Sequence, residues 1–116
     1  MQLNVQARPF KLTPALEASV AHNLSAVESR FGDRIRKVTV RMDDINGDKG
    51  GIDKRCRIVI DAQPRHTVVA QALTEDMYQS ISVAARRAET ALTRSLQRSR
   101  RSAARLNFEM PEDDAA

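Results

Sequence analysis

The sequence contains few aromatic residues: its 116 residues include no Trp, one Tyr and three Phe. A hydrophobic core built from this chain must therefore be mainly aliphatic. The scarcity also argues against a surface that stacks single-stranded RNA bases, because such surfaces use exposed aromatic side chains. The length suits one domain, which can bury a core without disulfides or metal ions.

Cysteine and histidine are nearly absent as well. Cys56 is the single cysteine, so no intrachain disulfide can form, which is consistent with a reducing cytosol. Its alternation with Ile58 and Ile60 predicts a buried structural thiol rather than a nucleophile. His22 and His66 have no Cys or His partners at metal-ligand spacing. We therefore expect no catalytic site, metal, cofactor or small-molecule substrate, and no enzyme activity.

Long hydrophobic runs are missing too. No apolar stretch approaches the length of a membrane span, and the N-terminal MQLNVQARPF lacks the hydrophobic segment of a signal peptide. We expect a cytoplasmic protein with no membrane partner. The glycine-containing segment 46–51 does not match a Walker or dinucleotide-binding motif and predicts a loop.

Charge is abundant and unevenly placed. The chain has 19 Lys and Arg against 15 Asp and Glu, a formal net charge of +4. Four of the acids and none of the bases lie in the last eight residues, which leaves a net charge of +8 on residues 1–108. A basic domain with an acidic tail suggests a polyanionic partner, with nucleic acid as the first candidate. Charge alone supports a partnerless basic protein equally well.

Alternation of apolar and polar residues predicts four strands, at about residues 3–8, 35–42, 53–62 and 66–73. A helix is predicted between the first two strands. It should begin after the N-cap Thr13, with Pro14 in its first position, and end at a left-handed C-cap on Gly32. Its apolar face recurs at helical spacing: Leu16, Val20, Leu24, Val27 and Phe31.

A second, longer helix is predicted after the last strand, with Thr74 as its N-cap and Glu75 and Asp76 in its first turn. It should run to about Arg101 or beyond. The resulting order, β-α-β-β-β-α, predicts an α+β fold in which a four-stranded mixed sheet carries both helices on one face. We expect one domain over residues 1–105 and an acidic, disordered tail over 106–116.

The second helix carries the clearest functional signal, a row of arginines beside its apolar stripe. With about 100° per residue, five of them fall within roughly 60° of one another: Arg87, Arg94, Arg98, Arg101 and Arg105. Glu89 is the only acid between Asp76 and Arg105, so the row lacks the alternating charges of an ordinary solvated helix. Guanidinium groups match phosphate geometry, which favours a phosphate-binding face over a bland charged one.

Further basic residues are candidates to extend this RNA-binding surface, namely Arg86 on the helix and Lys37, Arg41, Lys54, Arg55 and Arg57 on the strands. Ordinary surface charge is nearly as good an interpretation of the strand residues. A partner held in this way would be recognised by its backbone and shape, with a steep dependence on salt.

The segment Glu75-Asp76-Met77-Tyr78, followed by Ile81 and by basic residues spaced like Arg87, Arg94 and Arg98, resembles the family of ribosome hibernation promoting factor and ribosome-associated inhibitor A (protein Y), also called sigma-54 modulation proteins. The order of elements and the start of the first helix at 12–16 are similar too. The resemblance covers residues 1–101. Ser82 departs from the Asp or Asn of many members, and the helix is rich in Arg and Ala rather than Lys and Leu.

This resemblance implies a bacterial protein that binds small-subunit ribosomal RNA near the decoding region and silences translation under stress. It also implies the short form, without a second dimerisation domain. The alternative is a protein–protein regulatory module acting on the transcription machinery, as the sigma-54 name suggests. The sequence leaves the oligomeric state open.

Overall fold

The computed structural model describes residues 1–45, 52–63 and 65–109, and only the backbone of 99–109. Four strands form one sheet in the order β1-β2-β3-β4, with the bounds β1 (Gln2–Arg8), β2 (Ile35–Asp44), β3 (Lys54–Ala62) and β4 (His66–Thr74). β1 runs parallel to β2, whereas the other neighbours are antiparallel. This mixed sheet confirms the predicted fold class.

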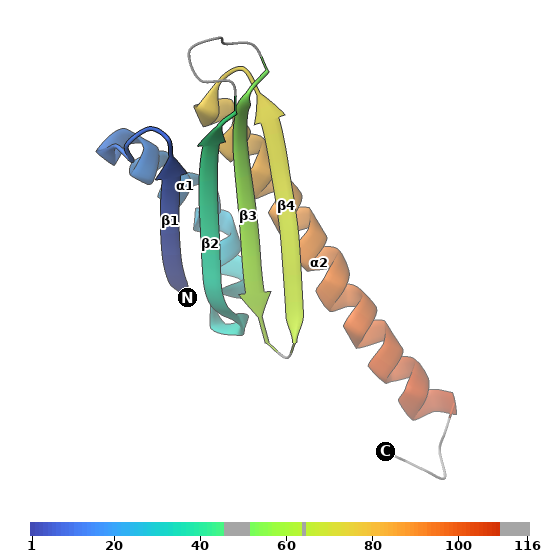
Figure 1. Cartoon of the computed structure of the whole chain (residues 1–116). Coiled ribbons are helices and arrows are strands. Elements are labelled where there is room, and N and C mark those ends of the chain that lie inside the picture. Colours follow the sequence, from blue (N-terminus) through green and yellow to red (C-terminus); the bar gives the residue numbers. More distant parts are fainter. Residues whose placement is uncertain (46–51, 64, 110–116) are drawn as a thin grey trace.

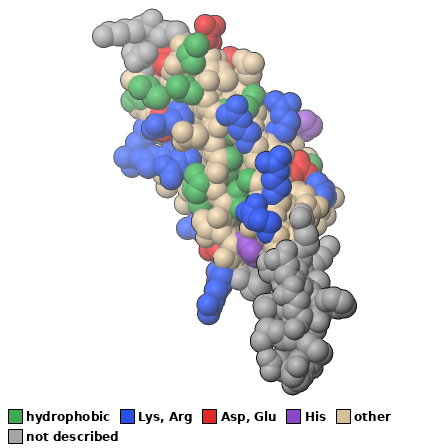
Figure 2. All heavy atoms as spheres, turned by 90° about the vertical axis from the view of Figure 1, so that its right-hand side faces the viewer, with side chains coloured by type: hydrophobic (Ala, Val, Ile, Leu, Met, Phe, Trp, Pro, Cys, Tyr) green, Lys and Arg blue, Asp and Glu red, His purple; other side chains and the backbone are tan. Residues whose placement is uncertain are grey.

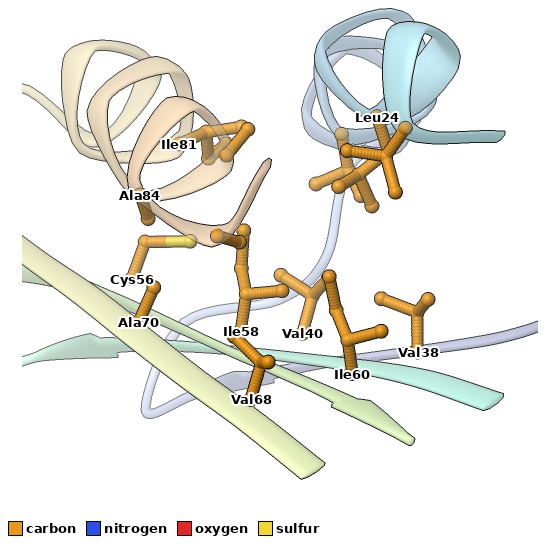
Figure 3. Packing of buried hydrophobic residues seen from close by; sticks show 14 of the residues in the cluster. Leu24, Val38, Val40, Cys56, Ile58, Ile60, Val68, Ala70, Ile81 and Ala84 are labelled. Carbon is orange, nitrogen blue, oxygen red and sulfur yellow. The ribbon is translucent and has the colours of Figure 1, made fainter. Parts of the chain in front are cut away.

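Both helices cover the same face of the sheet (Figure 1). α1 (Pro14–Phe31) makes the crossover between the parallel strands β1 and β2, and α2 (Met77–Glu109) follows β4. The core lies between this face and the helices, where Ile81 and Leu24 point toward the aliphatic residues of the strands (Figure 3). The predicted alternation is confirmed, because Val40, Cys56 and Ile58 are all buried.

The start of α1 agrees with the sequence prediction, since the Thr13 side chain accepts a hydrogen bond from the Leu16 amide at 3.2 Å. The predicted left-handed C-cap at Gly32 is wrong. Gly32 has right-handed helical angles (φ −52°, ψ −40°), and its amide donates to the Glu28 carbonyl. The chain continues directly into a short 3-10 helix, η1 (Gly32–Arg34), so no left-handed residue is needed before β2.

The start of α2 also differs from the prediction. Thr74 is the last residue of β4, where it pairs with Lys54. Asp76 caps the helix instead, because its carboxylate accepts a hydrogen bond from the Tyr78 amide at 3.1 Å. Its backbone carbonyl also accepts one from the Ser80 amide at 2.9 Å. The sequence predicted Glu75 and Asp76 in the first turn of the helix, but both residues precede it.

α2 is much longer than any strand. Its 33 residues span about 50 Å at 1.5 Å per residue, against about 30 Å for a strand of nine. The C-terminal turns therefore continue past the end of the sheet (Figure 1). Of the segment 106–116 predicted as a tail, the backbone is helical to Glu109, and residues 110–116 lie outside the described part of the chain.

Candidate nucleic-acid interface

The phase of α2 places its arginines beside the sheet. Met77, Ile81 and Leu92 are buried against the core, and a residue about 120° round the helix from that stripe emerges on the flank. Arg87 marks this flank, because its Nη1 donates a hydrogen bond to the backbone carbonyl of Gln71 in β4 at 2.9 Å. The arginine row thus runs along the side of the molecule formed by α2 and β4.

Arg87, Arg94 and Arg98 of this row are solvent-exposed, and so is the neighbouring Arg86. Among the described side chains, none of the four forms an ion pair with a carboxylate. Glu89, the one nearby acid in the helix, is held by Arg30 of α1 at 3.0 Å instead. The positive charge of these four arginines is therefore not neutralised by any described carboxylate and is available to an external anion. The side chains of Arg101 and Arg105 lie outside the described residues.

A hollow in this row is suited to a phosphate group. It has a volume of about 310 Å³ and is lined by Arg86, Arg87, Thr90, Ala91 and Arg94. Three guanidinium groups supply charged donors around it, and the Thr90 hydroxyl adds a neutral donor. Charge-assisted hydrogen bonds of this kind are roughly twice as strong as neutral ones. The hollow can therefore bind an anion while leaving its outer side open.

A second basic group lies on the open face of the sheet, the face away from the helices. The register places Arg41 opposite Arg57, on the faces of β2 and β3 that alternate with the buried residues. Lys37 and Arg57 are exposed. Arg8 in β1 pairs with Asp43 and lies on the same face, although it was not among the predicted RNA-binding residues. Its alternation with the half-buried Ala7 was the available signal.

Figure 2, which views the molecule from the α2 and β4 side, shows two groups of Lys and Arg side chains with hydrophobic side chains between them. Val69 and Leu73 of β4 are exposed large hydrophobic residues, at 50% and 46%. The two basic groups therefore lie on either side of the outer edge of β4, separated by these hydrophobic side chains. A polyanion that bends around this edge could contact both.

Acids compensate part of the open-face charge. Asp43 accepts hydrogen bonds from Nε and Nη2 of Arg55 at 3.2 and 3.0 Å, and Nε of Arg41 lies 4.0 Å from its other oxygen. Arg55 is thus tied to its own sheet, whereas Arg57 has no ion-pair partner among the described residues. The open face is consequently a weaker anion site than α2.

Lys54 is not part of either basic group. Its register with the buried alternation places it on the helix side of the sheet. Its ammonium lies 2.9 Å from the buried carboxylate of Asp53 and 3.1 Å from Asp44. Hydrogen bonds to Asp53 and then to Asp44 raise the pKa of Lys54 above its usual value. Lys54 therefore compensates a buried charge, although the sequence made it an RNA-binding candidate.

Cys56, the single cysteine of the chain, is buried. Burial raises the pKa of the Cys56 thiol to about 12, which leaves it protonated and unreactive at neutral pH. No group of three or more His, Cys, Asp or Glu side chains among the described residues is placed to hold a metal ion. None of the described helices combines the length and the hydrophobicity that crossing a bilayer requires.

Comparisons with known proteins found a matching family model and similar solved structures. A family model described as "Sigma 54 modulation protein / S30EA ribosomal protein" matches residues 3–100. A ribosomal subunit interface protein from Coxiella burnetii is similar in structure, with a TM-score of 0.68 and 20% identity over 84% of this chain and 99% of that one. The N-terminal domain of protein Y from Thermus thermophilus gives a TM-score of 0.67 and 22% identity over 81% and 98%. At identities of 20% and 22%, these similarities show that the two structures share the fold of this chain. No curated protein sequence matches the chain significantly.

Proposed function

The chain belongs to the sigma 54 modulation protein / S30EA ribosomal protein family, and on this basis we propose that it binds the small ribosomal subunit through ribosomal RNA. The observation that carries the proposal is the row of exposed arginines on α2, which have no ion-pair partners among the described carboxylates. Folded RNA presents closely spaced phosphates, and arginine is the side chain best matched to them.

The binding mode follows from which groups are available. Phosphates would lie against Arg86, Arg87 and Arg94, at the hollow that these residues line. Backbone recognition of this kind fixes position without reading sequence, so selectivity would come from the shape of the RNA. The exposed Arg57 and Lys37 on the open face would contact a second stretch of backbone beyond β4.

The biological role that suits this binding mode is translational silencing. A basic domain seated near the decoding region would occupy the space that mRNA and tRNA need, and so hold ribosomes inactive under stress. The protein would then act in the cytoplasm by occupancy rather than by catalysis. The similarity of the fold to a protein described as a ribosomal subunit interface protein supports this proposal.

Co-sedimentation with purified small subunits tests the proposal. The variant Arg87→Glu/Arg94→Glu/Arg98→Glu reverses three charges on an exposed surface and should abolish co-sedimentation at low salt. Arg94→Glu alone should weaken it, whereas Lys11→Glu, with the same charge change in the segment between β1 and α1, should leave it intact. Circular dichroism checks that each variant is folded. Undiminished co-sedimentation of the triple variant would rule out the arginine row as the binding surface.

The same protein variants also test the alternative, in which the partner is a protein of the transcription machinery. A pulldown with the wild-type protein before and after nuclease treatment distinguishes the two classes. Loss of the partner on RNA digestion supports the ribosomal RNA proposal. A protein that stays bound to the domain without RNA, and to the triple variant as well, supports the protein–protein module.

A further inference from the structure

A groove between the two helices has a different composition from the arginine row. It has a volume of about 280 Å³ and lies where the end of α1 and η1 meet α2. Its walls are Arg30, Phe31 and Arg34 on one side and Thr93, Leu96 and Gln97 of α2 on the other. The ion pair between Arg30 and Glu89 closes the α1 side of α2, whereas Arg87 contacts β4 on the opposite flank. The groove is therefore separate from the proposed ribosomal surface.

The groove holds two arginines in different states. Arg30 is fixed, because Glu89 binds its Nη1 at 3.0 Å and its guanidinium lies 4.8 Å from the centre of the Phe31 ring. Arg34 is exposed and has no ion-pair partner among the described residues. Its backbone carbonyl accepts a hydrogen bond from the Gln63 amide at 2.6 Å, which ties the η1 turn to the end of β3. Arg34 is thus an available cation on an anchored turn.

The rest of the groove is suited to a planar, partly apolar group. Phe31 is half-buried against the core and, with the buried Leu96, forms an apolar wall. The Thr93 hydroxyl donates to the Glu89 carbonyl at 2.9 Å, so its oxygen remains an acceptor for a ligand. The amide of Gln97 offers a donor and an acceptor side by side, as the edge of a nucleobase does.

We propose that this groove binds one nucleotide unit, with its phosphate on Arg34 and its base against Phe31 and Leu96, within reach of Gln97. The volume of about 280 Å³ lies just below the range of ligand pockets, about 300–1,000 Å³, so one nucleotide unit is the largest ligand that suits the groove. A bare anion would leave the apolar wall unused, and an acidic side chain would lack a ring to cover it. The inference goes beyond the proposed function, because the groove does not require a ribosome.

The test uses the intact protein, labelled with ¹⁵N, and follows backbone amide shifts on addition of 5′-mononucleotides. Saturable shifts should be confined to residues 30–34 and 93–97, with a dissociation constant in the millimolar range or tighter. Arg34→Ala should weaken binding about tenfold or more, because a hydrogen bond to a charged group is worth at least one factor of ten. The matched control is Arg36→Ala, which removes the same charge two residues away, where Asp61 already holds the guanidinium at 3.3 Å.

Two further probes separate the ligand's parts and its source. Inorganic phosphate should bind more weakly than a mononucleotide, and Phe31→Leu should reduce the difference between them. A single-stranded trinucleotide that binds about tenfold more tightly than a mononucleotide would identify RNA as the source of the bound nucleotide unit. Equal affinity would identify free nucleotides as the source. Either result supports the proposal that the groove binds a nucleotide unit.

Three results would overturn the proposal. These are the absence of shifts with both mononucleotide and trinucleotide, equal binding of phosphate and mononucleotide, or shifts spread along the α2 row and insensitive to Arg34→Ala. Because the samples contain no ribosomes, a negative result would contradict the nucleotide groove without contradicting binding to the small subunit. Conversely, the triple charge-reversal variant of the row should still bind mononucleotides in the groove.

Discussion

Replacing Arg94 with alanine should lower the salt dependence of RNA binding by close to one phosphate contact. The row and the neighbouring Arg86 together offer four described arginines without ion-pair partners. Each contacted phosphate contributes about 0.7 to 0.9 to the slope of log affinity against log salt, so these four contacts contribute about −3 to the slope, in addition to the contacts on the open face. Arg94→Ala should therefore make the slope less steep by about 0.7 to 0.9.

The assay is a titration of small subunits, or of a fragment of their RNA, with fluorescently labelled protein over a range of salt concentrations. Affinity should fall for Arg94→Ala at every salt concentration, and most at low salt, where counterion release contributes most. Arg87→Ala should have a smaller effect, because one of the donors of this guanidinium is already engaged by the Gln71 carbonyl. Lys11→Ala removes the same charge elsewhere and should leave the slope unchanged.

Equal slopes for wild type, Arg94→Ala and Lys11→Ala would refute the reasoning, because a local phosphate contact cannot be lost without changing the number of released counterions. An equal change of slope for Arg94→Ala and Lys11→Ala would also refute the local phosphate contact. Binding would then depend on the net charge of the molecule and not on the row.

Three other predictions concern stability. Leu92→Ala should lower the free energy of unfolding by about 2–5 kcal/mol, measured by urea denaturation, because Leu92 is fully buried in the core between α2 and the sheet; a loss below about 1 kcal/mol would contradict that packing. Asp76→Ala should lower the free energy of unfolding by about 1 kcal/mol, because it removes the N-cap of α2. An unchanged unfolding midpoint would show that another residue caps the helix. The Cys56 thiol has a pKa of about 12 in the folded protein against 9.0 for an unperturbed thiol, so the unfolded chain loses this proton first and stability falls as pH rises from about 9 toward 12. Between about pH 8 and about pH 10, wild type should lose about 1.4 kcal/mol relative to Cys56→Ala in urea denaturation, and parallel pH profiles would contradict the burial of the thiol.

The fold was predictable because its main determinants are local patterns in the chain. Alternation around Val40 and Ile58 identified the buried face of each strand, and the spacing of Leu16 and Leu24 identified the core side of α1. The family resemblance around residues 75–98 is confirmed by the family model. These signals do not require knowledge of which segments meet in space.

What the sequence could not predict depends on contacts between distant residues. Thr74 has the chemistry of an N-cap, but its pairing with Lys54 keeps it in β4 and passes the cap to Asp76. Lys54 seemed to be a free cation until the fold placed it between Asp53 and Asp44. These outcomes were set by tertiary structure, which overrides local propensity.

The candidate sites show the same contrast between local sequence patterns and contacts that form only in the folded protein. The arginine row was predictable because its members share one helix and one phase. The groove at Arg34 was missed because its two walls are about 60 residues apart in the chain and meet only when α1 packs against α2. A basic residue beside an aromatic one, as at Arg30 and Phe31, is too common in sequences to indicate such a groove by itself.

The hydrogen bond from Arg87 to Gln71 has a consequence for how neighbouring molecules behave at high concentration. β4 is one of the two outer strands of the sheet, and the backbone of an outer strand is a template onto which another chain can add. An incoming strand would find the Gln71 carbonyl occupied and would have to bring its own backbone against a guanidinium charge. Strand addition at this position of β4 is therefore disfavoured, and a substitution of Arg87 would remove that obstacle.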